Sequence, residues 1–350
     1  MLTREARKML DKRQQKILRA VVYRYIMTGV PVGSKSLAET LNLGISSATI
    51  RNELNKLEGL GYLYQPHVSA GRVPTDLGYR FYVDSLMGRT RLREEEKEAI
   101  LTLFSNKTKE LENLLQETSN LLSRLTSTAA MIIAPSLRRN LIKHVDLVKL
   151  SGSMILLVII TDTGRVEKKL IDAGEGFTEA NLESVQAFLN RRLHGKGTDD
   201  LANFADEKRL RDEKTSRLAR KVVDVIRDIL TQEQYEKVYV GGTVNLLRYL
   251  DEEGVKRIES LLKHFEEQYF LLNLMSEAIR AKELTVRIGD ENILKELQYF
   301  SLVATPYAIG EEMMGTVSVL GPTRMDYARV IPTVDFIAKS LSRTLEMLKG

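Results

Sequence analysis

The sequence predicts an α+β multidomain protein whose N-terminal domain is small and mainly helical. At 350 residues the chain is longer than one hydrophobic core usually covers. Residues 1–93 hold 16 Lys or Arg against 7 Asp or Glu, a net charge of +9. Because the whole chain carries +5, residues 94–350 carry −4. Helical periodicity dominates the first part, and the longer strand-like segments follow residue 135.

Composition excludes several classes of protein. The chain has no cysteine, so it has neither disulfides nor thiolate metal sites. Its first residues are charged where a signal peptide needs an apolar core, and the longest aliphatic run, 154–160, is too short to cross a bilayer. We therefore expect a cytoplasmic protein without membrane contact. The four histidines lack metal-binding spacing, and no nucleophile or phosphate-loop motif occurs, so we expect no cofactor and no enzymatic activity.

The basic N-terminal part has two interpretations. A basic head on a mildly acidic body favours a polyanionic partner for the head alone. A basic surface that is merely solvated explains the same charge equally well. The local patterns have to decide between the two.

Three helices are expected in the head. Ile17, Val21 and Tyr25 recur at helical spacing, and Gly29 ends that helix. Ser34 can cap a second helix, residues 42–44 make a turn, and Ser46 or Ser47 can cap a third. The third helix has Ile50, Leu54 and Leu57 on one face. The opposite face consists of Ala48, Arg51, Asn52, Asn55 and Lys56.

That polar face suits DNA, although a generic three-helix bundle could also have it. Asn pairs bidentately with adenine and Arg with guanine, and small side chains allow close approach to bases. The next residues favour DNA. "YLYQ" (62–65) alternates like a strand, 66–71 is a turn, and "RVP" can return as its partner. A hairpin after such a helix is the wing of a winged helix-turn-helix. Thr75 can cap the helix that follows.

These residues resemble a known family. The stretch 32–84, with its blocks "SSATIRNEL" and "SAGRVPTDLGYRFY", is similar to the N-terminal domain of the bacterial heat-inducible transcription repressors, HrcA. "VYVGGTVNLL" (238–247), "VRIGDEN" (286–292) and "GPTRMDYARVIPTVDFIAKSLSRTL" (321–345) resemble the same family, in the same order.

The resemblance implies a domain plan and a function. It implies a winged-helix domain over 1–93, a GAF-like α+β domain over 94–175 and 255–350, and an inserted dimerisation domain over 176–254. It implies a homodimer that represses chaperone operons at an inverted-repeat operator in double-stranded DNA. Release would follow heat stress, and chaperonin would be the partner that keeps the repressor active.

Within that frame we assign the DNA contacts from the predicted helix face and hairpin tip. Base reading is assigned to Thr49, Arg51, Asn52, Asn55 and Lys56. Phosphate or minor-groove contact is assigned to Lys35, Ser46, Ser47, His67, Ser69 and Arg72.

The body leaves other interpretations open. Leu111, Leu114, Leu121 and Leu125 predict an amphipathic helix packed on its own domain rather than a dimer seam. Three strands are expected at 145–150, 154–161 and 165–171, and helices near 179–192, 207–230, 255–282 and 327–348. A strand near 283–289 and a hairpin of 301–307 with 316–320 are expected between the last two helices. The cluster around Arg324 and Asp326 is interpreted as an ion pair bracing a turn. The alternative function is a winged-helix regulator that senses a small molecule in the GAF-like domain.

Overall fold

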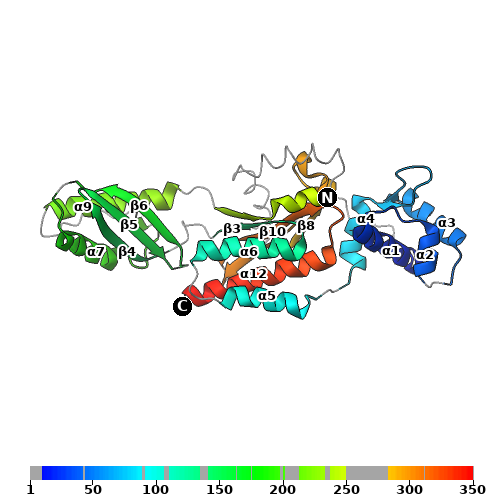
Figure 1. Cartoon of the computed structure of the whole chain (residues 1–350), viewed down its shortest axis with the longest axis horizontal. Coiled ribbons are helices and arrows are strands. Elements are labelled where there is room, and N and C mark those ends of the chain that lie inside the picture. The colour runs from blue at the N-terminus through cyan, green and yellow to red at the C-terminus, as the bar shows by residue number, and fades with distance from the viewer. Residues whose placement is uncertain are drawn as a thin grey trace.

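The computed structural model describes residues 10–41, 44–88, 91–105, 110–134, 141–162, 164–174, 176–197, 200–201, 213–232, 237–249, 283–310 and 312–349. Figure 1 shows three parts in a row: a helical head, a central sheet flanked by helices, and a smaller sheet at the far end. This mixture of helices and strands agrees with the expected α+β class. The expected helix at 255–282 lies outside the described residues.

The head begins with three helices, α1 (Lys12–Thr28), α2 (Ser34–Thr40) and α3 (Ser47–Gly59). Asp11 caps α1 in a capping box with Gln14, and Gly29 ends it in the left-handed conformation. The cap of α2 differs by one residue from the expected one: the N-cap is the extended Gly33, and Ser34 is the first helical residue. Of the expected turn after α2, residues 42 and 43 lie outside the described part.

A short antiparallel hairpin follows α3. Its strands are β1 (Leu63–Tyr64) and β2 (Val73–Pro74), with Leu63 opposite Pro74. Thr75 caps α4 (Asp76–Phe81), as expected, by accepting a hydrogen bond from the Gly78 amide. A π-helical turn, Tyr82–Leu86, then leads out of the head.

The central sheet is antiparallel and buried on both faces. Its strands are β3 (Ala129–Ile133), β7 (Val238–Gly241), β8 (Thr285–Ile288), β9 (Phe300–Ile309) and β10 (Glu312–Pro322), in the order β7-β3-β10-β9-β8. One face packs on α6 (Leu111–Thr126) and α12 (Tyr327–Lys349), and α5 (Glu94–Ser105) packs in turn on these two helices. The leucines of α6 are buried or partly buried against this core, which confirms the amphipathic-helix interpretation. Strand β3 was not expected, because five consecutive apolar residues show no periodicity.

The second sheet has its own core. Among the residues that the structure describes, its strands pair only with one another; they are β4 (Ile142–Ser151), β5 (Met154–Thr161) and β6 (Val166–Asp172). The helices α7 (Glu179–Leu193) and α9 (Glu213–Gln232) cover one face of this sheet. The expected boundaries placed these strands with the central domain and β7 in the insertion. Strand pairing contradicts both placements. β7 belongs to the central sheet, because it pairs with β3, and β4 to β6 form the separate unit, which begins at β4.

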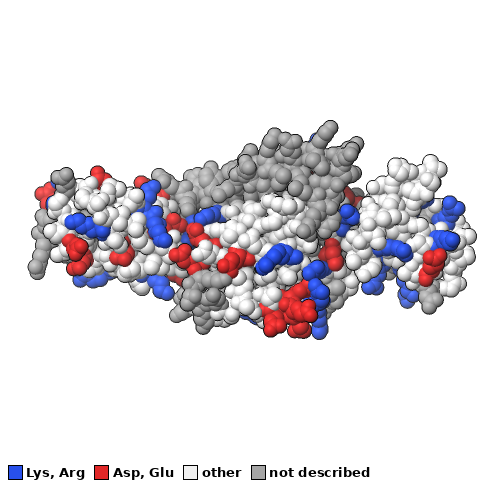
Figure 2. Space-filling view, in the orientation of Figure 1, with Lys and Arg blue, Asp and Glu red and all other residues white. Residues whose placement is uncertain are grey.

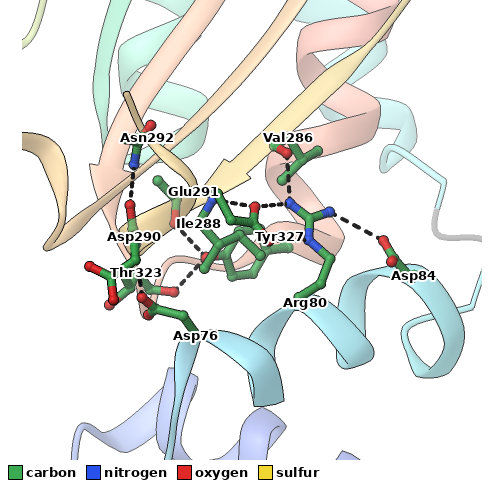
Figure 3. A network of polar contacts seen from close by, with 12 residues as sticks. Asp76, Arg80, Asp84, Val286, Ile288, Asp290, Glu291, Asn292, Thr323 and Tyr327 are labelled. Atoms are coloured by element: carbon green, nitrogen blue, oxygen red, sulfur yellow. Dashed lines mark hydrogen bonds and ion pairs between the residues drawn. The ribbon is translucent and has the colours of Figure 1, made fainter. Parts of the chain in front are cut away.

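Head and central part are joined through α4 (Figure 3). The Arg80 guanidinium forms an ion pair with Glu291, donates to the Val286 carbonyl oxygen at 2.7 Å and contacts Asp84 at 3.2 Å. Glu291 also accepts a hydrogen bond from the Ile288 amide at 2.9 Å. One arginine therefore connects α4 to the edge strand β8 and to the turn that follows it.

Two further contacts complete the joint. The Asp76 carboxylate accepts a hydrogen bond from the Asp290 amide at 3.0 Å, and burial raises the pKa of Asp76. Gly289 has a φ of 55°, and a side chain there would collide with the Asp76 carboxylate. The Tyr79 and Tyr327 rings lie 6.1 Å apart, and the buried Tyr327 hydroxyl is 2.7 Å from the Ser301 hydroxyl. The sequence blocks 69–84, 286–292 and 321–345 thus meet at one place.

Arg324 and Asp326 also lie near this joint. Arg324 lies against Gly29 at the end of α1, so it contributes to the contact between head and body. The Asp326 carboxylate accepts a hydrogen bond from the Arg329 amide at 3.3 Å, at the start of α12. Asp326 thus braces the start of the helix and Arg324 contacts the head, while the expected ion pair between these two side chains stays a prediction. No helix in the described part of the chain is long and apolar enough to span a bilayer.

The packing of α4 on the hairpin generates a stability prediction. A side chain at Gly78 would collide with the Tyr62 carbonyl oxygen, whereas a methyl group at Gly59 would meet no atom within 4 Å. We expect Gly78→Ala to lower the free energy of unfolding by about 1–3 kcal/mol, because backbone has to move. Gly59→Ala, the matched control, should be neutral or stabilising. Thermal denaturation followed by circular dichroism measures both, and equal melting temperatures would contradict the close approach.

Candidate nucleic-acid interface

Helix α3 presents two chemically different faces. Ile50, Leu54 and Leu57 are buried in the head. The residues on the opposite face are exposed: Ala48, Arg51, Asn52, Asn55 and Lys56. The structure therefore places the predicted base-reading side chains together on one accessible helical face, with Thr49 half-buried at its edge.

The N-terminus of α3 is organised by Ser46. Its hydroxyl accepts a hydrogen bond from the Thr49 amide at 3.2 Å and lies 3.0 Å from the Thr49 hydroxyl. Ser47 is exposed and is the first residue of the helix. Of the two candidate caps, Ser46 is the one used. Its hydroxyl and that of Thr49 already have intramolecular roles, whereas the Ser47 side chain faces solvent.

Glu53 anchors α3 to α1. Its carboxylate is buried and forms ion pairs with Arg13 at 2.6 Å and Lys56 at 3.2 Å. It also accepts a hydrogen bond from the side-chain Nε2 of Gln14 at 3.3 Å. The prediction from sequence missed this residue. A charged side chain three residues after Ile50, on the apolar face, was the available indication.

The hairpin tip projects away from the helices. Gln65 closes the loop by donating to the carbonyl oxygens of Val68 and Ala70, both at 2.9 Å. His67 and Ser69 are exposed, and Val68 is 99% exposed. The tip is therefore accessible to a partner.

Arg72 differs from the other predicted contacts. Its side chain is only 13% exposed, and its guanidinium pairs with Glu58 at 2.8 Å and with the Asn55 side-chain oxygen at 2.9 Å. It binds the protein itself, in contrast to the phosphate or minor-groove role expected for it. Lys35 is exposed on α2. Figure 2 shows Lys and Arg side chains at this outer end of the molecule, where α2 and α3 lie in Figure 1.

Within the described ranges, no group of three His, Asp or Glu side chains could hold a metal ion. The head thus combines an exposed polar helix, a projecting hairpin and a basic surface, which are the features of a DNA-binding domain.

Comparison with known proteins identifies the family. The family described as "HrcA protein C terminal domain" matches residues 112–331. A heat-inducible transcription repressor HrcA from Desulforamulus reducens is 37% identical, covering 97% of this chain and 99% of that protein. The one from Streptomyces avermitilis is 38% identical, covering 96% and 99%. The chain belongs to the HrcA family of heat-inducible transcription repressors.

A solved structure with a similar sequence supports the overall fold. A protein described only as hypothetical, with a crystal structure at 2.2 Å resolution, is 31% identical and has a TM-score of 0.68. The superposition covers 97% of this chain and 100% of that one. The relatives' names refer to repression of transcription and not to an enzymatic reaction.

The contrast between Ser46 and Ser47 generates a prediction. Ser46→Ala removes the cap of α3, so we expect it to lower the stability of the protein by about 1 kcal/mol. Ser47→Ala should change stability by less than about 0.5 kcal/mol, because its side chain is exposed and does not cap the helix. Urea denaturation of the two variants measures the difference. Equal losses would show that the Ser46 hydrogen bond does not stabilise the helix.

Proposed function

We propose that this protein represses transcription by binding an inverted-repeat DNA operator as a homodimer, with α3 and the hairpin as a winged helix-turn-helix. The observation that carries the proposal is the exposed face of α3, where Arg51, Asn52 and Asn55 point away from the core. Such side chains match base edges in the major groove, where a recognition helix lies. The hairpin tip with His67 and Ser69 would then contact the backbone or the minor groove.

The operator assignment follows from symmetry and from the family. A two-fold dimer presents two recognition helices, so its site is an inverted repeat. The relatives are named heat-inducible repressors, which supports operators upstream of chaperone genes. This evidence favours the repressor over the small-molecule sensor, since none of these names refers to a ligand. A footprint on the promoter of the organism's own chaperone genes would test the target.

The open face of the second sheet supports the dimer. α7 and α9 cover the inner face, but the outer face carries Val148, Leu156 and Leu170 side by side across the three strands. Val148 is 41% and Leu170 56% exposed, and Leu150 beside them is 53% exposed. Aliphatic groups clustered on an exposed sheet face mark an interaction surface, and a second copy of this chain fits the proposed dimer.

A temperature response needs no ligand site. Domains are stable by only about 5–15 kcal/mol, so moderate warming can unfold one of them. The second sheet has a hydrophobic core separate from that of the head, so its loss could end dimerisation while α3 stays folded. Chaperonin is proposed as the partner that refolds the protein, so that repression follows the supply of free chaperonin.

This temperature mechanism has a direct test. After mild heating of the full-length protein, operator binding should fall, and chaperonin with ATP should restore it. The small-molecule fraction of a cell lysate should not restore it. Recovery with that fraction alone would favour the sensor hypothesis instead.

Mutations should distinguish the residues that read bases from the residues that contact phosphate. We expect Asn52→Ala and Arg51→Ala to weaken operator binding by about 1–3 kcal/mol and to change binding to random DNA little. Lys35→Ala should weaken both alike and reduce the salt dependence of log K by roughly one unit. Fluorescence anisotropy over a salt series measures these effects. Equal losses on both DNAs for Asn52→Ala would remove it from the base-reading role.

Dimerisation should depend on the outer face of the second sheet. Leu170→Glu places a charge in the aliphatic cluster, so we expect a monomer with operator affinity reduced at least about tenfold, since the two half-sites are no longer bound by one tethered particle. Leu101→Glu on α5 is the matched control, because Leu101 is also 51% exposed but lies elsewhere. Sedimentation velocity reports the state of association. A Leu170→Glu protein that remains dimeric would place the interface on another surface.

A further inference from the structure

Arg72 lies between the hairpin and the base-reading helix. Its Nη2 donates to Asn55 Oδ1 at 2.9 Å and lies 2.8 Å from Glu58 Oε2. Both acceptors belong to α3, one turn apart on its exposed side. The Arg72 side chain is 13% exposed, so little of it is left for an outside partner.

The backbone holds Arg72 firmly in this position. The Arg72 amide donates to the Val32 carbonyl oxygen at 2.8 Å, and the Val32 amide donates to the Arg72 carbonyl oxygen at 2.9 Å. Gly71 lies so close to Pro31 and Val32 that a side chain there would collide with their backbone. The end of the hairpin is thus tied to the segment before α2, and the guanidinium is directed at α3.

This contact determines how Asn55 presents its amide. Arginine has only hydrogen-bond donors, so the atom of Asn55 that faces it has to be the oxygen. Arg72 engages one lone pair of this oxygen and holds the oxygen toward the hairpin. The Nδ2 amino group, which can only donate, is then the part of Asn55 turned toward another molecule. Asn52, one turn earlier, is exposed, and no hydrogen bond engages its side chain within the described residues. Asn52 therefore keeps both a donor and an acceptor.

We propose that Arg72 is a positioning residue that fixes Asn55 as a hydrogen-bond donor, so that Asn55 selects guanine or thymine at its operator position. In the major groove guanine offers the acceptors N7 and O6, and thymine offers O4. Cytosine offers only its amino group there. Adenine offers N7 beside its amino group, so a donor gains one bond and leaves that amino group unpaired, because bidentate pairing needs the Asn55 oxygen turned to the base and Arg72 holds it toward the hairpin. Asn52 has no such restriction. This inference rests on the proposed function, because it presumes that α3 reads bases.

The inference also separates Arg72 from the residues that bind phosphate. Glu58 compensates its charge at 2.8 Å, so Arg72 should release few counterions from DNA. A phosphate ligand such as the one expected at Lys35 should instead contribute about one unit to the salt dependence. The two roles of an arginine are thus distinguishable by experiment.

The test uses the full-length protein and operators in which each half-site position carries each of the four bases. Asn55→Ala identifies the operator position that Asn55 contacts, because the variant should no longer distinguish the four bases at that position. At that position the unmodified protein should bind guanine or thymine about tenfold more tightly than adenine or cytosine. Arg72→Gln should reduce this preference to about threefold or less and leave the salt dependence unchanged. Glu58→Gln, which keeps the contact of Arg72 with Asn55, should retain the preference.

Several outcomes overturn the inference without touching the proposed function. Preference for adenine or cytosine at the Asn55 position would do so, and it needs no variant of Arg72, so a folding defect cannot obscure it. Equal weakening at all four bases by Arg72→Gln, with a salt dependence lower by about one unit, would make Arg72 a phosphate ligand. If instead the unmodified protein fails to distinguish the operator from random DNA, the proposed function itself fails.

Discussion

The ion pair of Arg80 with Glu291 is the contact on which the arrangement of this molecule depends. It joins the last helix of the head to the edge of the central sheet, and the same arginine holds the Val286 carbonyl oxygen (Figure 3). Beside it the hydrophobic core continues from the head into the body through Tyr79 and Tyr327. The direction in which α3 faces is therefore set by the body. For a dimer on an inverted repeat, this joint would determine whether two heads fit two half-sites.

Inside the head, charged side chains fix the position of α3, the proposed recognition helix, from two sides. Glu53 fastens α3 to α1, and Arg72 with Glu58 fastens it to the hairpin. Burying a charge costs free energy unless the charge is paired, so these ion pairs add little net stability. Their main effect is to fix the position and orientation of α3. A helix that reads bases needs this geometry, because a shift of its axis would misplace every side chain on its face.

The molecule has separate hydrophobic cores, so its parts can differ in stability. In the described part of the chain, head and central sheet share one continuous apolar cluster, whereas the second sheet forms a separate cluster with α7, α9 and Leu201. Parts with separate cores can unfold at different temperatures. A sensor of heat that works through its own stability requires such a difference, and the proposed dimer surface lies on the separate part.

Local patterns in the sequence determined much of the head. Helical periodicity placed Ile50, Leu54 and Leu57 inside and Asn52 outside, and the cap at Thr75 follows from residue type. Residue type left Ser46 and Ser47 open as the cap of α3. These features depend on neighbours within a few residues, so a single sequence contains them. The family followed from motifs that occur in one order along the chain.

Tertiary structure alone decided which distant segments meet. Strand β7 pairs with β3 across more than a hundred residues, and β4 to β6 separate from the central sheet, because pairing depends on packing that no local pattern encodes. The same holds for Arg72. From the sequence, Arg72 is a basic residue on a hairpin that could bind a DNA phosphate. Only the fold brings Glu58 and Asn55 within reach of its guanidinium.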